Sequence, residues 1–241
     1  MKWVAVFGLA AMVASGTSAK PVKTERVSNA LEFSYEWPAK VQSIKGLHRY
    51  LQSDLEKAFR QASADAADDQ QAAHSNNYPF RQHSFSMSWD SEGESARLIS
   101  LEGNLAWDSN GAHPNSSTKA LLWDSQSDRQ SAVSDLFSTP AAFQAPTRAA
   151  YCKALNAERL RRREGEKLEG VFSQCPPYKE LAILLVDRNR DRRFDHILFV
   201  APPYVAGPYV EGDYEISLPV TQNLIAALKP DCRSSFQPQR Q

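Results

Sequence analysis

The chain has 241 residues, 42% of them hydrophobic and 23% charged, with 28 basic and 28 acidic side chains and a formal net charge of zero. This length suffices for one sizeable domain or for two small intertwined ones. A balanced charge does not steer a protein toward nucleic acid, so we expect no nucleic-acid partner.

The first residues have the pattern of a secretory signal peptide. Lys2 precedes an apolar run, Trp3 to Ala14, and small residues follow it up to Ala19. The alternative is a retained membrane anchor, but the run is shorter than the roughly 20 apolar residues that span a bilayer. We therefore expect cleavage near Ala19 and a periplasmic or secreted protein that does not span the membrane.

The N-terminal half predicts a strand, a helix and a hairpin. Leu31–Trp37 alternates apolar and polar residues, as a strand does. From Val41 to Ala62, apolar residues recur every three or four positions, which predicts a helix of about six turns. Residues 63–77 lack large apolar side chains and are interpreted as a frayed helix end and a loop. Two more strands, Phe80–Trp89 and Arg97–Trp107, are joined by a polar turn in which Gly93 supplies the bend.

The middle of the chain predicts short elements and a second helix. Lys119–Trp123 is a short strand, and Ser134–Phe137 follows as a short element of its own. Ser138 or Thr139 can cap a helix whose first residue is Pro140.

Pro146 then restarts this helix for the run Thr147–Arg163, whose end carries a cluster of arginines. Cations are favoured near a helix C-terminus by the helix dipole, and we favour that interpretation. The alternative is a site for a polyanion such as a phosphate-bearing polymer. The clustered residues are Arg159, Arg161, Arg162 and Arg163.

Two apolar runs, Leu181–Val186 and Phe194–Val200, predict a hairpin with a charged connection. Acidic and amide residues in the connection match several positions of a calcium-binding loop. However, Arg192 occupies the position where that loop needs glycine, and Leu198 the position of its bidentate glutamate. We therefore interpret the connection as a solvated hairpin tip and expect no metal site. The matching residues are Asp187, Asn189, Asp191 and Asp195.

The segment from Tyr204 to Val220 places three tyrosines among turn-forming glycines and prolines. From Tyr214 onward, apolar and polar residues alternate, which predicts a half-buried strand. Tyrosines offer a large contact area at a low entropic cost, which suits a recognition surface. For Tyr214, which begins the strand, packing in the core is the favoured alternative. The last residues, 234–241, are expected to form a disordered tail.

Three cysteines are present in a chain expected to enter an oxidising compartment, which suggests one pair and one spare. A bridge from Cys152 to Cys175 would join the second helix to the loop that follows it. We favour this pairing over those that use Cys232, which lies in a stretch with little reason to be ordered. A metal site is a weak alternative, because the cysteines lack CxxC spacing and have no neighbouring histidine.

A histidine, His113, lies in the polar turn from Asp108 to Pro114. Histidine near aspartate and serine suggests a hydrolase, but no nucleophile is marked and the GxSxG pattern is absent. Because Pro114 holds the preceding residue out of a helix, we interpret His113 as a structural or ligand-contacting residue. The hydrolase alternative pairs His113 with Asp108 or Glu211.

Three pieces of the sequence together resemble an exported domain of unknown function. They are the turn Gly111–Pro114, the short element Asp135–Phe137 and the segment Tyr204–Pro219. The domain is the extracellular C-terminal region of RsiV-type lysozyme-sensing anti-sigma factors, and it also occurs in some secreted polysaccharide deacetylases. The strand at Leu31–Trp37 with its following helix is similar to the small domain that usually precedes it.

The resemblance implies a binding function. We expect neither the membrane helix of the anti-sigma factors nor the metal-dependent catalytic domain of the deacetylases, and we expect no cofactor. The expected function is that of an exported envelope protein that recognises lysozyme, another cell-wall-directed protein or a peptidoglycan fragment, without catalysis of its own. The expected ligand-binding residues are His113, Tyr204, Tyr209, Glu211 and Tyr214.

The expected fold class is α+β. A twisted, mainly antiparallel sheet would be packed on one face by the long N-terminal helix and flanked by the second helix. After the signal peptide, residues 1–19, the chain would comprise a strand-helix-hairpin part, 20–110, and a C-terminal part, 111–233. These two parts are expected to form one compact unit, followed by the disordered tail, 234–241.

Overall fold

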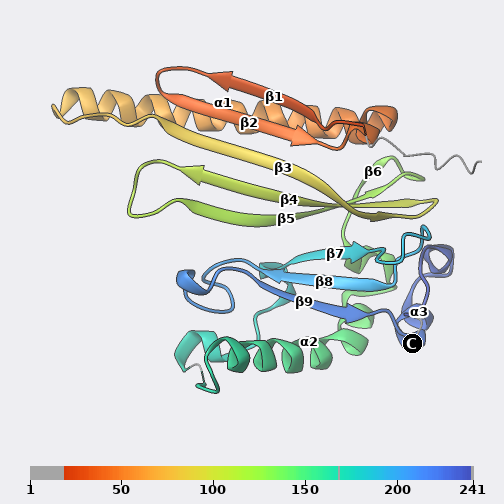
Figure 1. The fold of residues 1–241 in the computed structure, drawn as a ribbon. Coiled ribbons are helices and arrows are strands. Elements are labelled where there is room, and N and C mark those ends of the chain that lie inside the picture. The colour runs from red at the N-terminus through yellow and green to blue at the C-terminus, as the bar shows by residue number, and fades with distance from the viewer. Residues whose placement is uncertain (1–18, 168, 240–241) are drawn as a thin grey trace, which may run out of the picture.

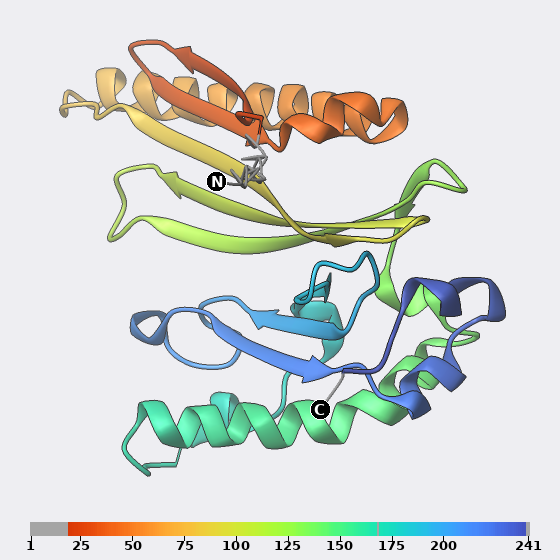
Figure 2. The same ribbon diagram turned by 45° about the vertical axis from the view of Figure 1, so that its right-hand side comes forward.

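The structure, a computed structural model, describes residues 19–167 and 169–239. Apart from Ala19, the expected signal peptide lies outside these residues. The protein is α+β, as predicted, and it has four layers: a long helix, a large sheet, a small sheet and a second long helix (Figure 1). The same layers are visible after a rotation of 45° (Figure 2). Within the described residues, no helix combines the length and the apolar character that a membrane crossing requires.

The large sheet has six strands in chain order. These are β1 (Val22–Val27), β2 (Leu31–Trp37), β3 (His83–Glu94), β4 (Leu98–Asp108), β5 (Asn115–Asp124) and β6 (Arg129–Ser131). Neighbours are antiparallel except β2 and β3, which run parallel with Leu31 opposite His83. A parallel pair needs a crossover connection, and the first long helix provides it. The mainly antiparallel sheet predicted from the sequence is therefore present, with one parallel pair.

The small sheet has three antiparallel strands, β7 (Ala182–Val186), β8 (His196–Ala201) and β9 (Tyr214–Pro219). The hairpin predicted from the two apolar runs is confirmed as β7 and β8. The α-helices are α1 (Lys45–Ser75), α2 (Pro140–Arg162) and α3 (Gln222–Ala227). Short 3-10 helices are η1 (Ala39–Ser43), η2 (Val133–Leu136), η3 (Gly170–Ser173), η4 (Tyr178–Glu180), η5 (Tyr209–Glu211) and η6 (Pro230–Ser235).

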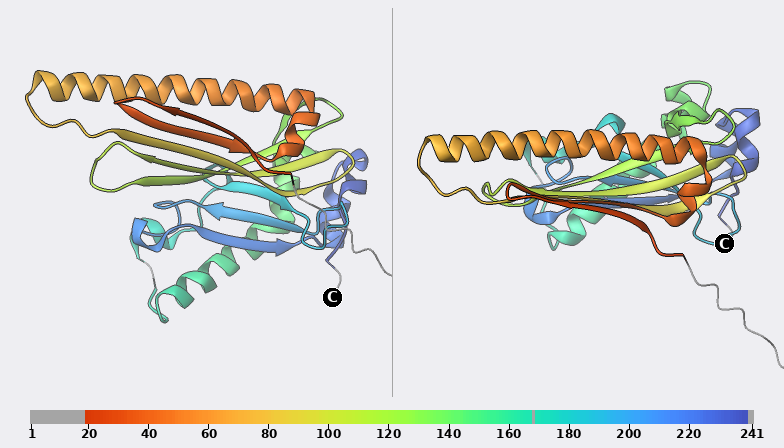
Figure 3. Two further views of the ribbon diagram at one scale, coloured as in Figure 1. Left: turned by 45° about the horizontal axis from the view of Figure 1, so that its top comes forward. Right: turned by 90° about the horizontal axis from the view of Figure 1, so that it is seen from above.

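Helix α1 is much longer than predicted. Residues 63–77 were expected to be a frayed end and a loop, but the helix continues to Ser75. Alanine, glutamine and aspartate fill this stretch, and alanine has the highest helix propensity, so the helix persists without large apolar side chains. Ala66 and Ala73 are buried and keep this half of the helix close to the rest of the protein. The right-hand view of Figure 3, seen from above, shows α1 lying over the large sheet.

Gly93 does not make the turn that was expected between residues 90 and 94. Strand β3 continues to Glu94, with a bulge between Ser91 and Gly93, and the turn begins at Ser95. Gly93 has a φ of +155°, and a Cβ there would lie 2.7 Å from the Cβ of Asp187. Glycine is therefore needed because the end of β7 approaches the large sheet at this point.

The two sheets are joined through β7 and the loop before β9, on the face of the large sheet that is opposite α1 (Figure 1). The backbone N–H of Leu185 donates to Ser100 Oγ at 3.1 Å, and that of Asp187 donates to the carbonyl of Glu92 at 3.0 Å. These hydrogen bonds connect the two sheets directly. The division expected at residue 110 falls between β4 and β5, which pair along their whole length.

The core consists mainly of two clusters. One lies between α1 and the large sheet and contains Leu47, Leu51, Leu55 and the buried tryptophans of the strands. The other lies between the small sheet, α2 and α3, and is centred on aromatic residues such as Phe199. Helix α2 begins as predicted, because Thr139 Oγ1 accepts the N–H of Ala142 at 3.1 Å. It continues through Pro146 as a single helix.

The expected disordered tail is wrong for the described residues up to 239. Phe236 and Gln237 are only 4% exposed, and Phe236 packs against Phe194. The N–H of Gln237 donates to the carbonyl of Phe194 at 3.1 Å. Cys232 is also buried, at 1% exposure, within the second cluster. The residue in the sequence that could have indicated an ordered C-terminal segment is Phe236, its one large apolar side chain, which fills the end of the core.

Candidate functional site

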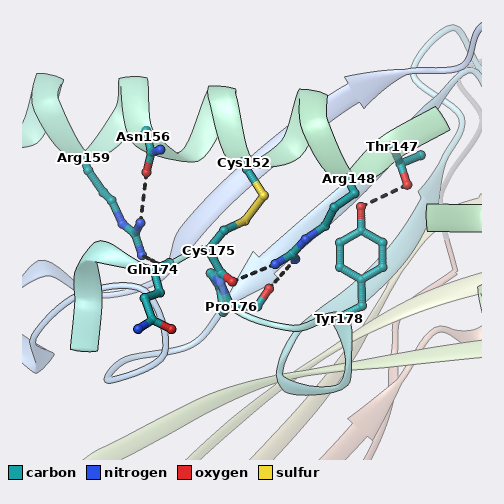
Figure 4. The surroundings of a disulfide bond; sticks show 9 residues. All are labelled: Thr147, Arg148, Cys152, Asn156, Arg159, Gln174, Cys175, Pro176 and Tyr178. Atoms are coloured by element: carbon teal, nitrogen blue, oxygen red, sulfur yellow. Dashed lines mark hydrogen bonds between the residues drawn. A yellow bond between two sulfur atoms is a disulfide. The ribbon is translucent and has the colours of Figure 1, made fainter. Parts of the chain in front are cut away.

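A disulfide fixes the region beneath the small sheet. Cys152 of α2 and Cys175 are bridged, which confirms the predicted pairing, and Cys232 is free and buried. The guanidinium of Arg148 donates to the carbonyls of Cys175 and Pro176, at 2.7 and 2.5 Å (Figure 4). The bridge and this arginine together hold the segment before β7 against α2.

The arginines at the end of α2 bind the tyrosine segment. Arg159 is 3% exposed and donates to the carbonyls of Ala206 and Gln174, at 2.9 and 3.0 Å. Arg162 donates to the carbonyls of Glu211 and Asp213, at 2.7 and 2.8 Å. These guanidinium groups are occupied by backbone oxygens, so a polyanion site is not supported at Arg159 or Arg162.

Tyr214 and Glu211 form the buried end of this segment. Tyr214 is fully buried, its hydroxyl donates to the carboxylate of Glu211, and the guanidinium of Arg162 lies 4.0 Å above its ring. Burial raises the pKa of Tyr214, and the Glu211 carboxylate adds to this effect. Glu211 also pairs with Arg163 at 2.5 Å. The structure thus places Tyr214 and Glu211 where they hold the loop, as the packing alternative for Tyr214 proposed.

Gly207 permits this arrangement. A Cβ at Gly207 would lie 2.4 Å from Glu211 Oε2 and 2.8 Å from the ring of Tyr214. No side chain fits there without moving the buried group. The turn signal read in the sequence at Gly207 therefore reflects close packing of the loop over Tyr214.

His113, Tyr204 and Tyr209 form a cluster at the surface, which we call the aromatic cluster. The rings of His113 and Tyr209 are stacked, with centroids 4.0 Å apart, and Tyr204 lies 5.7 Å from Tyr209. The Tyr209 hydroxyl donates to the Pro114 carbonyl at 2.5 Å, and the Tyr204 hydroxyl lies 3.3 Å from His113 Nε2. Three of the five predicted ligand-binding residues are thus together, on loops from both sheets.

The aromatic cluster is accessible. Tyr204 is 58% exposed and the neighbouring Val210 is 89% exposed. Tyr204 has a φ of +69°, a left-handed conformation that is costly for a tyrosine. The arginine contacts of the same loop hold this backbone in place and so present the ring to solvent.

The hydrolase alternative lacks its central contact. His113 Nδ1 lies 2.8 Å from the carbonyl of Pro114, and its other nitrogen faces Tyr204. Asp108 accepts the N–H of Asn110, and Glu211 is bound by Arg163 and Tyr214. Among the described residues, neither carboxylate is hydrogen-bonded to His113, so the arrangement does not form an acid–base pair.

In the calcium-like connection between β7 and β8, carboxylate oxygens accept hydrogen bonds from backbone N–H groups of the same connection. The carboxylate of Asp187 accepts the N–H groups of Asp191 and Arg192, at 3.2 and 2.8 Å. Within residues 19–167 and 169–239, no group of three or more histidine, cysteine or acidic side chains is arranged to hold a metal ion. The Asp187 carboxylate thus binds the backbone of the hairpin connection itself.

Three glutamates meet between the sheets, a feature that the sequence did not suggest because Glu215 lies more than 100 residues after the other two. Glu92, Glu102 and Glu215 belong to β3, β4 and β9. Burial raises the pKa of Glu102 to about 7, and repulsion from Glu92 and Glu215 contributes. Burial also raises the pKa of Glu92. Glu102 and Glu92 therefore hold their protons to a higher pH in the folded protein than an exposed glutamate does, because each has a raised pKa.

We predict that this group makes stability depend on pH. Glu102 binds a proton more tightly in the folded protein than in the unfolded chain. Its contribution to the stability of the fold is therefore present below pH 4.5 and is lost as the pH rises through about 7. The substitution Glu102→Gln should stabilise the protein at pH 8 by about 1 kcal/mol, a value reduced for the half-exposed position. It should have little effect at pH 4.5. Urea unfolding at both pH values measures this, and an equal effect at both would contradict it.

Comparison with known proteins shows the fold. No protein-family model and no curated protein matches the sequence. The structure is similar to the crystal structure of a DUF3298 family protein from Pseudomonas aeruginosa PAO1, with a TM-score of 0.58 and 16% identity, over 92% of this chain and 96% of that one. It is also similar to a DUF3298 family member from Bacteroides fragilis NCTC 9343, with a TM-score of 0.52 and 15% identity, over 83% and 89% of the two chains. At these identities the likeness extends to the fold alone.

Proposed function

We propose that the protein is an exported binding protein of the cell envelope that recognises a lysozyme-like protein or a cell-wall fragment through the aromatic cluster. The observation that carries the proposal is the assembly of His113, Tyr204 and Tyr209 from two loops into one patch, in which Tyr204 is exposed and the other two rings are half-buried. Stacked aromatic side chains on a rigid base are typical of binding hot spots.

The rigidity of the base supports the proposal. Arg162 and Arg163 fix the loop from below through Glu211 and Asp213, while Tyr209 fixes the β4–β5 loop through Pro114. Binding then requires little ordering of the loops, which would otherwise reduce the affinity. Export agrees with the signal-peptide pattern and with the disulfide, because disulfides persist in oxidising compartments.

We predict that a c-type lysozyme binds the protein with micromolar or tighter affinity and that Tyr204→Ala with Tyr209→Ala weakens binding at least tenfold. The reason is that truncating two central tyrosines removes most of the contact area of the aromatic cluster. Calorimetric titration measures the affinity, beside a lysozyme activity assay.

The control is Tyr78→Ala, which removes a tyrosine that is 52% exposed and outside the aromatic cluster. It should leave binding unchanged. If lysozyme gives no heat, titration with soluble peptidoglycan fragments tests the other ligand class. Absence of binding to both would rule out the proposal.

A further inference from the structure

A groove runs between the second half of α1 and the strands β3 and β4, on the opposite face of the large sheet from the small sheet. It has a volume of about 670 Å³. Phe85, Leu105 and Trp107 contribute aromatic and aliphatic surface to it, and Trp107 is 37% exposed. The other tryptophans among the described residues are at most 5% exposed.

The groove exists because α1 changes character along its length. In its first half, Leu47, Leu51 and Leu55 fill the space above the sheet. Further along, the helix contributes the small side chains of Ala58 and Ala62, which pack at the edge of the same core cluster and line the groove. The helix continues because alanine favours helix, so the space stays open instead of collapsing.

The side chains around the groove are strongly acidic. Four aspartates line it, against one lysine, Lys119, and one histidine, His83. Asp69 is already paired with His83, at 3.2 Å. Asp65 and Asp68 are exposed on the helix, and no lysine or arginine occurs between Gln61 and Ser75. The groove therefore combines apolar walls with an excess of negative charge.

We propose that this groove binds an exposed arginine-bearing segment of a partner protein. A guanidinium can stack on an aromatic face such as Trp107 and at the same time bind carboxylates in a planar, two-pronged manner. Asp65 and Asp68 line the same groove as Trp107. The charge of the groove excludes acidic segments, because like charges facing each other across an interface are costly.

This surface is separate from the aromatic cluster, and the inference does not depend on the proposed function. The groove reaches Asp108 and Ser109 at the start of the β4–β5 loop, whereas His113 lies further along that loop and faces the small sheet. Asn110 anchors the loop between them by donating to the carbonyls of Arg81 and Gln82, both at 3.1 Å. A partner could therefore contact either surface alone.

The test uses a fluorescein-labelled peptide of alternating arginine and leucine, with an alternating glutamate and leucine peptide for comparison, and measures anisotropy at low salt. We expect saturable binding of the basic peptide only. The double substitution Asp65→Asn with Asp68→Asn should weaken it roughly fivefold, as the loss of two exposed ion pairs predicts. Trp107→Ala should weaken it about tenfold.

Two matched variants separate this site from general charge effects and from the aromatic cluster. Glu164→Gln with Glu166→Gln removes two exposed acids from the loop after α2 and should leave peptide binding unchanged. Tyr204→Ala with Tyr209→Ala should also leave it unchanged. Thermal melting verifies that each variant folds, and Trp107→Phe, which keeps an aromatic ring, should restore much of the affinity.

Three results would overturn the inference. They are no saturable binding of the basic peptide, equal weakening by the two acidic pairs, and equal affinity for the glutamate peptide. If neither lysozyme nor peptidoglycan fragments bind while the basic peptide binds as described, the proposed function is wrong and the groove stands.

Discussion

Replacing Phe199 with alanine is expected to lower the free energy of unfolding by about 3–5 kcal/mol. Phe199 is fully buried between the small sheet and α2. Its ring contacts Tyr151 and Tyr178, with centroids 5.0 and 5.2 Å apart, and stacks on Phe143 at 6.2 Å. The substitution removes apolar surface from among three other aromatic rings, and the neighbours are too closely packed to fill the cavity.

Urea unfolding measures this effect. The expected loss is a large part of the 5–15 kcal/mol that is typical of a folded domain. Val210→Ala, at a position that is 89% exposed, is the control and should change stability by less than about 0.5 kcal/mol. A loss below about 1 kcal/mol for Phe199→Ala would mean that the rings around Phe199 rearrange to close the gap, contrary to the packing described.

Removing the disulfide by Cys152→Ala with Cys175→Ala is expected to cost about 3 kcal/mol. The bridge closes a loop between residues 23 positions apart, and its loss gives the unfolded chain more conformational freedom. Arg148 and Arg159 still bind the carbonyls of Gln174, Cys175 and Pro176, so the segment should stay folded at room temperature.

Reduction provides an independent measurement of the same effect. Dithiothreitol should lower the melting temperature of the wild-type protein to that of the double variant, and it should not affect the double variant itself. The free thiol of Cys232 is buried, so Cys232→Ala should keep the full response to reduction. If reduction leaves the wild-type melting temperature unchanged, the bridge does not contribute to stability as stated.

Local patterns in the sequence predicted local structure well. The β7–β8 hairpin, the cap at Thr139 and the pairing of Cys152 with Cys175 all depend on residues close in sequence or on simple counting. Strand β1 was missed because Val22–Val27 is polar and lies at the sheet edge, half exposed, where periodicity is weak. The second half of α1 was missed because a helix made of small residues lacks an apolar stripe.

The contacts of the candidate site were harder to predict from the sequence than the secondary structure was. His113 and Tyr204 are 91 residues apart, and only the docking of the two sheets brings them together. They were predicted as one surface by resemblance rather than by any local pattern. Nothing in the run of arginines at the end of α2 indicated that their partners would be the carbonyls of Ala206, Glu211 and Asp213. Long-range contacts of this kind require the fold.

The burial of the C-terminal residues has a consequence for the order of folding. Ser95, in the β3–β4 turn, bonds Ser235 at 2.9 Å, and Arg97 bonds Asp231 at 2.7 Å. The large sheet can pair its own strands early, since all of them lie before residue 132. The junction of the large sheet with the C-terminal segment closes only when residues 231–237 arrive. Such late, long-range contacts are slow to form, so this junction should be the last part of the protein to gain protection from hydrogen exchange.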